Sequence, residues 1–465
     1  MENKRPFRLV WDSKITAVSR PSNVALQEMQ RVLVNPVFDN QEYFESGPEY
    51  QPRGEAIQNV YYYGDNYELL QALISEPVQP QIDLIYIDPP YMTDLDYHSA
   101  ISVGAYSDVR HINREAFQDQ WPGGLDSYLD MLYPRLQLMR EVLKQEGSIL
   151  VHVDWHASHY VRVLLDEIFG PENFINEIAW CFGGGSSSRR YFHRKHDLIF
   201  WYARSPKYTY NPQYRPYTQG TVQRGLTAVK GDRYKLNEEG ALMQDWWVDI
   251  SKILSPTARE NLKYPTQKPK ELLRRLIVAA SPPGGRVADF FAGSGTIAEV
   301  CNEMGRSWIL GDNSRLALQT SLYRLIRSGS PPFTIARAEH AMQGNASGKL
   351  ILKKPGRIAV DANTQLITIG IEYFHPAEMD EREAFQNFAD YIEFWEIDLD
   401  FDGKIFNSHY QVIRPKQRFK EPIALEMTVR AAVRAAVREE HRIAVKVWDV
   451  YANQTLAAVT GPGNY

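Results

Sequence analysis

A short apolar run that stops abruptly at a proline-rich turn constrains the fold of this chain more than any other feature. Residues 82–87 read Ile-Asp-Leu-Ile-Tyr-Ile, and Asp88-Pro89-Pro90-Tyr91 follows directly. A mostly apolar strand of this kind is typical of the interior of a parallel sheet whose two faces are both covered. The run therefore predicts a buried parallel strand with a polar turn at its carboxyl end.

Strands and helices alternate on both sides of this run. Strands are predicted at 60–63, 148–153, 286–290 and 308–312, and helices at 67–74, 127–144, 160–169 and 270–280, with another helix beginning at Thr296. The helix over 127–144 rests on apolar residues at helical spacing. This alternation predicts an α/β fold, a doubly wound Rossmann-like domain.

The chain has 465 residues, which is more than one ordinary hydrophobic core accommodates. We interpret residues 1–55 as an N-terminal arm, 56–330 as the α/β domain and 331–465 as a β-rich, sandwich-like C-terminal domain. The α/β alternation breaks at a glycine- and serine-rich stretch beginning at Gly183. The irregular, aromatic and basic segment over 181–262 is interpreted as an insert within the α/β domain.

Residues 428–442 are predicted to form a helix within the β-rich part. Arg430, Arg434, Arg438 and Arg442 recur at every fourth position and would form one stripe. Because like charges at this spacing repel, the stripe needs an anionic partner. We expect the acidic segment over 398–402 to supply it; DNA phosphate or an acidic surface of another subunit is the alternative.

Asp88, Pro89, Pro90 and Tyr91 are the candidate catalytic residues, because open α/β sheets bind ligands at the carboxyl ends of their strands. An exocyclic base amine is a poor nucleophile, since its lone pair is delocalised into the ring. The Asp88 carboxylate and the Pro89 carbonyl can accept hydrogen bonds from such an amine, and the prolines stiffen the turn. Tyr91 offers an aromatic face to a base swung out of a duplex. The alternative is a plain turn that Asp88 caps.

A second turn between a strand and a helix reads Asp289-Phe290-Phe291-Ala292-Gly293-Ser294-Gly295-Thr296. Its glycines let the backbone approach a ligand closely, and the helix that follows favours a carboxylate at its N-terminus. Asp312 ends the next strand, where an acidic side chain can accept both hydroxyls of a ribose. A helix cap is the alternative role for Asp312.

Together these motifs resemble the β class of DNA amino-methyltransferases, which includes the modification subunits of type III restriction systems. That class is similar in carrying D-P-P-Y first, a target-recognition insert second and F-x-G-x-G last, as here in 88–91, 181–262 and 291–295. The stretches 64–66, 166–174 and 264–269 match it as well. The likeness covers roughly residues 56–328, and it departs at Asp312, where the class often has Glu.

The resemblance implies that S-adenosylmethionine is the cofactor. The residues expected to bind it are Asp65, Asn66, Lys268, Asp289, Phe290, Phe291, Gly293, Gly295, Thr296 and Asp312. It further implies methyl transfer to N6 of adenine in double-stranded DNA, as the modification part of a restriction-modification or related defence system. A restriction or helicase subunit is then a candidate partner, and a homodimer is a candidate assembly.

Three other functions stay open at this point. N4 methylation of cytosine uses the same geometry, although Ser is commoner than Asp at the first motif position in those enzymes. A non-catalytic DNA-recognition subunit is a second alternative, against which the intact Asp88 and Tyr91 argue. An RNA or protein methyltransferase fits the order of motifs less well.

Arg189, Arg190, Arg194 and Lys195 are the candidate DNA-binding residues within the insert. The net charge of the chain is −5, so positive charge for DNA must be local. Basic side chains neutralise phosphates, while the alternative is an ordinary solvated loop.

Other features narrow the class of protein. His152, Asp154 and His156 alternate near a strand end, but no metal is expected, because methyl transfer from a sulfonium needs no Lewis acid. Two cysteines, Cys181 and Cys301, fit a reducing cytoplasm. The sequence has neither a signal peptide nor an apolar run long enough to span a bilayer. We therefore expect a cytoplasmic protein that does not associate with a membrane.

Overall fold

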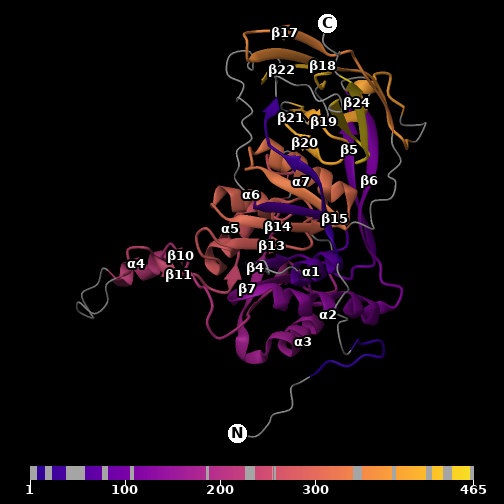
Figure 1. The fold of residues 1–465 in the computed structure, drawn as a ribbon. Coiled ribbons are helices and arrows are strands. Elements are labelled where there is room, and N and C mark those ends of the chain that lie inside the picture. Colours follow the sequence, from indigo (N-terminus) through magenta and orange to yellow (C-terminus); the bar gives the residue numbers. More distant parts are fainter. Residues whose placement is uncertain are drawn as a thin grey trace.

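The computed structural model describes most of the chain. The described residues are 8–15, 24–37, 58–75, 82–104, 109–184, 188–225, 236–253, 255, 258–338, 348–379, 384–414, 422–432 and 442–460. Its architecture is one long mixed sheet with helices on both faces, and a smaller β-rich part at one end of it (Figure 1).

The central sheet has eleven strands in the order β12-β8-β9-β7-β4-β13-β14-β3-β15-β1-β20. Its middle is parallel and consists of β7 (Leu143–Val153), β4 (Ile82–Ile87), β13 (Arg286–Asp289), β14 (Ser307–Asp312), β3 (Asn59–Tyr63) and β15 (Phe333–Ala338). The strand at 82–87 is buried throughout, as its apolar sequence predicts. The order places β13 and β14, which come late in the chain, between the early strands β4 and β3.

Helices cover both faces of this sheet, which confirms the doubly wound prediction. α1 (Asn66–Ser75), α2 (Gly124–Val142) and α3 (Ser158–Phe169) pack with Ile85 and Ile87 of β4 on one face. α5 (Lys270–Ala280), α6 (Thr296–Glu303) and α7 (Arg315–Arg327) pack with Leu84 and Tyr86 on the other. Alternate side chains of one strand therefore feed two separate cores. No helix among the described residues has both the length and the apolar character needed to cross a bilayer.

Part of the predicted insert belongs to the central sheet. β9 (His196–Ala203) pairs antiparallel with both β7 and β8 (Phe174–Cys181), and the short helix Pro171–Asn173 precedes β8. After β9 come the short elements β10 (Tyr214–Arg215), α4 (Gln219–Gly225), β11 (Ala241–Leu242) and β12 (Trp246–Trp247). Figure 1 shows α4 and β10–β11 projecting away from the sheet. Within the predicted insert, β9 and β12 thus belong to the central sheet, and the described residues between these two strands form only short elements.

A long hairpin, absent from the predicted elements, rises directly from the D-P-P-Y turn. β5 (Leu95–Val103) pairs antiparallel with β6 (Arg110–Asp119), and residues 105–108 between them lie outside the described part. Ile101, Val103 and Ile112 belong to the same apolar cluster as the core of the C-terminal part. The hairpin therefore joins the D-P-P-Y turn to the β-rich part, beside which it runs in Figure 1.

The C-terminal part consists of two facing sheets, as the predicted sandwich requires. One contains β16 (Lys349–Leu352), β17 (Gly356–Ala359), β18 (Thr364–His375) and β22 (Glu426–Ala432). The other contains β2 (Pro36–Val37), β21 (Tyr410–Ile413), β19 (Ile392–Phe401), β23 (Arg442–Asp449) and β24 (Gln454–Thr460); the short helix Phe388–Tyr391 precedes β19. Apolar side chains from both sheets form a single cluster between them.

The residues interpreted as an arm also contribute strands. β1 (Leu26–Val32) pairs with β15 and with β20 (Phe406–Ser408), and β2 joins the C-terminal sheet. Gln30 donates to the buried Glu396 at 2.7 Å, which ties β1 to that sheet. The N-terminal residues that the structure describes thus join the two parts.

The predicted helix over 428–442 is wrong. Residues up to Ala432 form β22, which pairs antiparallel with β18, and Arg442 begins β23. Arg430 lies 3.8 Å from Asp361, not against the acidic segment 398–402. Arg434 and Arg438 lie outside the described residues. Because Val429 of the ladder is buried between the two sheets, packing has overridden the helical spacing of the arginines.

Candidate active site

A cavity of about 1240 Å³ opens at the carboxyl ends of β3, β4, β13 and β14. These four strands are neighbours in the sheet, so the turns that follow them converge on one place. Of the predicted catalytic and cofactor residues, the cavity is lined by Asp65, Asn66, Asp88, Pro89, Pro90, Tyr91, Phe290, Phe291, Gly293 and Asp312. Two motifs that are some 200 residues apart in sequence thus share one cavity.

Asp88 has a partner on each oxygen of its carboxylate. The Tyr91 hydroxyl donates a hydrogen bond to Oδ1, and the ammonium of Lys268 pairs with Oδ2. Burial and the neighbouring Asp88 carboxylate raise the pKa of the Tyr91 phenol well above its usual range, so the phenol keeps its proton and stays a donor. The carboxylate is therefore held in one orientation toward the cavity.

Asp119, at the end of β6, holds the backbone that follows Asp88. Its fully buried carboxylate accepts the backbone N–H groups of Tyr91, Met92 and Thr93 at 2.9–3.1 Å and the Thr93 hydroxyl at 2.7 Å. Met92 has a φ of 64° and Asp94 a φ of 56°, in the left-handed region that non-glycine residues rarely adopt. These hydrogen bonds offset the cost of that conformation and fix the turn.

The glycine-rich turn is built around Asp312. The N–H of Gly293 donates to Asp312 Oδ2 and the N–H of Ser314 to Oδ1, both at 2.8 Å. Gly293 has a φ of 50°, and a Cβ there would lie 3.2 Å from the Tyr264 ring, so only glycine fits this position without a shift. Burial raises the pKa of Asp312 to about 6. The site thus offers a carboxylate acceptor within a closely packed backbone, which fits a ribose.

Polar contacts near another part of the cavity connect α2 to Phe290, the residue that follows β13. Arg135 donates to Asp65 Oδ1 and to Asn66 Oδ1, both at 2.6 Å, and the Asn66 amide donates to the Phe290 carbonyl at 2.6 Å. Asp65 keeps about half of its side chain exposed and lies against the cavity. The first turn of α1 is therefore held against the aromatic pair 290–291.

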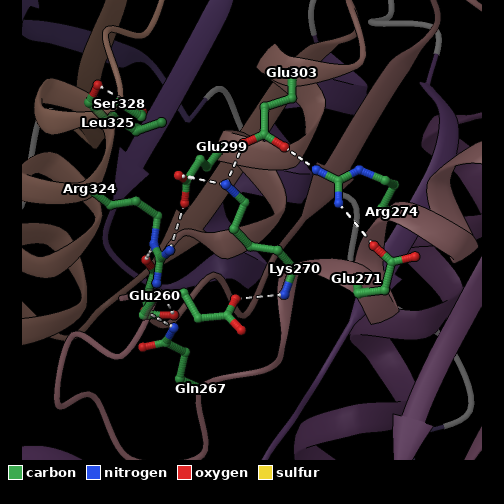
Figure 2. A network of polar contacts seen from close by, with 11 residues as sticks. Glu260, Gln267, Lys270, Glu271, Arg274, Glu299, Glu303, Arg324, Leu325 and Ser328 are labelled. Atoms are coloured by element: carbon green, nitrogen blue, oxygen red, sulfur yellow. Dashed lines mark hydrogen bonds and ion pairs between the residues drawn. The ribbon is translucent and has the colours of Figure 1, made fainter. Parts of the chain in front are cut away.

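A network of charges joins the segment before α5 to the glycine-rich turn (Figure 2). Lys270 pairs with Glu299 at 2.9 Å, and Arg324 pairs with the other oxygen of Glu299 at 2.7 Å. Arg324 also donates to the carbonyl of Ser294 in the glycine-rich turn at 2.7 Å. The loop before Lys270 is attached through Glu260, which accepts the Lys270 N–H at 3.0 Å. The 264–269 segment and the glycine-rich turn are thus positioned by one network.

Four of the predicted cofactor residues lie outside the lining of the cavity. Lys268 is buried against Asp88, and Asp289 is buried and accepts the Phe291 N–H at 2.9 Å. Gly295 has a φ of 68°, and a Cβ there would lie 2.5 Å from Ser321 Oγ. Thr296 is buried at the start of α6. These four residues do not contact the cavity themselves; they support the neighbouring residues that line it.

His152 belongs to a buried polar chain next to Tyr91. Its ring contacts the Tyr86 hydroxyl at 2.9 Å and Asp197 at 3.4 Å, and its centroid lies 6.0 Å from that of Tyr91. Burial lowers the pKa of His152, so the ring is neutral near pH 7. Asp154 and His156 pair with each other at 2.8 Å instead. The alternating residues 152–156 therefore serve separate local contacts.

The predicted DNA-binding residues lie on the loop between β8 and β9. Arg189, Arg190 and Arg194 are exposed, and Lys195 is half-buried; none of them lines the cavity. The guanidinium of Arg194 lies 3.8 Å from the centroid of the Trp155 ring. Trp155 follows the carboxyl end of β7, the strand beside the one that carries Asp88. The loop is thus attached near the D-P-P-Y turn.

Several contributors to the cavity were missed by reasoning from the sequence. They include the hairpin with Asp119, Arg135 on α2, Arg315 on α7, and a C-terminal group at 378–379 and 451–453. Asp119 stands in the polar stretch Gln118-Asp119-Gln120, which is a weak signal for a cap. Arg135 lies on α2 between Leu132 and Leu138, and its sequence context gives no signal for a ligand site.

Comparison with known proteins identifies the family. The family described as DNA methylase matches residues 82–321, just over half of the chain. Among similar proteins, the type II methyltransferase M.EcaI of Enterobacter cloacae is 27% identical over 336 residues, covering 59% of this chain and 71% of its own. M.HpaI of Haemophilus parainfluenzae is 29% identical over 246 residues, covering 52% of this chain and 68% of its own.

A shorter match is the EcoPI Mod subunit, a type III restriction-modification enzyme of Escherichia phage P1. It is 29% identical over 167 residues, covering 33% of this chain and 26% of its own. Among solved structures, the M1.HpyAVI–SAM complex aligns with a TM-score of 0.38 and 17% identity over 57% of this chain and 98% of its own. Because the family match spans both the D-P-P-Y and the glycine-rich motifs, the chain belongs to the DNA methylase family, and its methyl donor is S-adenosylmethionine.

Proposed function

We propose that this protein methylates N6 of adenine in double-stranded DNA, as the modification part of a restriction-modification system. The observation that carries the proposal is the position of Asp88 and Tyr91 in the same cavity as Phe291, Gly293 and Asp312. A cavity of about 1240 Å³ exceeds the roughly 300–1,000 Å³ typical of a single small-molecule site. It therefore has room for both a cofactor and a base swung out of the duplex.

The residues divide between the two ligands. Asp312 accepts hydrogen bonds from the ribose hydroxyls, and Asp65 with the 290–291 pair bounds the rest of the cofactor. When bound, S-adenosylmethionine supplies an electrophilic methyl group on a sulfonium. The Asp88 carboxylate and the Pro89 carbonyl accept hydrogen bonds from the amino group of the base, which frees the lone pair of its nitrogen for attack. Tyr91 stacks against the base.

After transfer, the methylated nitrogen carries one proton too many. The Asp88 carboxylate is positioned to take this proton, because it already faces the amine. The neutral His152 behind Tyr91 adds no positive charge there, which suits a site that holds a sulfonium. Asp119 keeps the turn in place throughout, so the acceptor groups need no rearrangement during reaction.

Adenine is favoured over cytosine by Asp88 itself, since Ser is commoner at this position in the N4-cytosine enzymes of the resembling class. The loop over 188–195 provides the contact to phosphate, because three of its cations are exposed beside the carboxyl end of β7. A restriction subunit as partner is supported by the Mod subunits among the similar proteins.

Methylation-sensitive sequencing of DNA from cells that express the protein tests the proposal, with Asp88→Ala as the matched control. The expected result is N6-methyladenine at one short recognition sequence, absent from the control. N4-methylcytosine in its place would support the alternative base specificity. Unmodified DNA in both samples would contradict the proposal and support the alternative of a non-catalytic DNA-recognition subunit.

A further inference from the structure

One wall of the cavity comes from outside the residues that the family match covers. Glu378, Met379, Tyr451, Ala452 and Asn453 line the cavity together with the motifs described above. All five belong to the C-terminal β-rich part, whereas the family match ends at residue 321. This part of the chain therefore reaches the site of methyl transfer.

The turn between β23 and β24 forms the greater share of this wall, and its shape is set by Asp449. The Asp449 carboxylate accepts the N–H of Tyr451 at 2.9 Å and that of Asn453 at 2.8 Å. Ala452 has a φ of 67°, in the left-handed region, and is almost fully buried. It shares an apolar cluster with Tyr264, the residue that packs against Gly293. The turn is thus built in one conformation against the glycine-rich motif.

Arg315 connects this turn to the ribose site. It is the first residue of α7, three positions after Asp312, and its exposed side chain lines the cavity. Its guanidinium donates a hydrogen bond to Asn453 Oδ1 at 2.7 Å. One residue of the C-terminal turn therefore holds a planar cation in the cavity that Asp312 also lines.

Two buried contacts keep the turn and the catalytic part together. Gln319 of α7 donates to the Asp449 carbonyl at 2.6 Å. Arg114 of the hairpin pairs with Glu393 of β19 at 3.2 Å, with both side chains buried. Breaking a buried pair of this kind is costly, so the C-terminal wall does not separate freely from the site.

We propose that Arg315, held in place by Asn453, covers the adenosine end of the cofactor, which makes the C-terminal part a component of the S-adenosylmethionine site. This inference rests on the proposed function, in which Asp312 takes the ribose. A planar, weakly hydrated guanidinium stacks well on an aromatic ring, and the adenine ring lies next to the ribose. The pair also explains why a polar turn of a distant domain projects into the cavity.

Calorimetric titration of the full chain with S-adenosylmethionine tests the proposal. Arg315→Gln and Asn453→Ala should each raise the Kd about fivefold to tenfold, as expected for the loss of one stacking contact. The double variant should add little to either single change, because the two residues act as a unit. Asn363→Ala is the matched control: this asparagine is exposed in the same part of the chain, does not line the cavity, and should leave the Kd within twofold.

Two further measurements separate this role from a purely structural one. The melting temperature without cofactor and the Kd for DNA should stay unchanged in Arg315→Gln, whose side chain is exposed. An unchanged Kd for S-adenosylmethionine in Arg315→Gln would overturn the inference even if Asn453→Ala failed to fold. If the unaltered chain bound no S-adenosylmethionine, the proposed function itself would fall; normal binding in folded variants of an active enzyme would overturn this inference alone.

Discussion

The ammonium of Lys268 forms an ion pair with the carboxylate of Asp88, although 180 residues separate them in the chain. Both side chains are largely buried, with 9% and 16% of their surface exposed. The pair joins the 264–269 segment, which the family resemblance assigns to the cofactor, directly to the D-P-P-Y turn. The two halves of the site are therefore linked by charge as well as by position in the sheet.

Asp88→Ala should abolish methyl transfer and leave cofactor affinity nearly unchanged. All four residues line the cavity, and in the proposed function Asp88 faces the amine, whereas Asp65, Phe291 and Asp312 hold the adenosine. Loss of a positioned acceptor of this kind lowers kcat by about 10²–10³-fold or more. Transfer of labelled methyl and the Kd for S-adenosylmethionine should be measured on one preparation. Substantial residual turnover would contradict the assignment of Asp88.

Lys268→Met should lower kcat at saturating cofactor more than it changes the Kd for S-adenosylmethionine. The side chain holds Asp88 and does not line the cavity, so its loss frees the carboxylate to rotate. Lys268→Arg, which keeps the charge, should recover part of the activity. Lys207→Met, at an exposed ion pair, serves as the control. A large rise in the cofactor Kd with normal kcat would instead support the cofactor role implied by the resemblance.

Asp119→Asn should lower both activity and stability. The amide has one acceptor oxygen where the carboxylate has two, so some of the N–H groups of 91–93 lose their partner. Each buried donor left unpaired costs about 1–3 kcal/mol. Steady-state kinetics and thermal unfolding should show a fall in kcat together with a fall in Tm. Asp96→Asn, exposed on the same hairpin, should leave both values intact; equal effects in the two variants would argue against a special role of Asp119.

The sequence predicts the parallel strands and their polar ends well, because apolar periodicity and a proline-rich turn are local signals. The same locality explains the errors. Valines and arginines recur at helical spacing from Val429 and Arg430 onward, which predicts a helix. These two residues instead form part of β22, because β22 pairs with β18 and Val429 is buried between the two sheets. The pair between Lys268 and Asp88 and the contact from Arg315 to Asn453 depend on the order of strands in three dimensions, which no local pattern records.

Replacing Arg189, Arg190, Arg194 and Lys195 together by alanine should weaken DNA binding and flatten its dependence on salt. Each lost phosphate contact removes about 0.9 from the slope of log K against log salt concentration. The matched control replaces Lys353, Lys354, Arg357 and Lys404, four exposed cations of the C-terminal part, and changes net charge equally. A salt slope that is the same in both quadruple variants would show that the loop does not contact phosphate.

Asp312 should make cofactor binding and stability respond to pH in opposite directions. Burial raises its pKa to about 6, whereas an unfolded aspartate titrates near 3.9. The folded state therefore favours the protonated form, and the contribution of Asp312 to stability decreases as pH rises from about 4 to about 6. Ribose binding needs the ionised acceptor, so the affinity for S-adenosylmethionine should increase over the same interval and level off above it.

Asp312→Asn separates these two effects. The neutral amide avoids the cost of a buried charge but leaves the N–H of Gly293 or of Ser314 without its acceptor, so the melting temperature of the cofactor-free variant should be lower and should no longer fall as pH rises toward 6. Its affinity for S-adenosylmethionine should fall at least tenfold and lose the rise around pH 6, because one ionisable acceptor is gone. Calorimetric titrations and thermal unfolding between pH 5 and pH 8 would check both expectations. An unaltered pH profile of cofactor binding in Asp312→Asn would show that another group controls it.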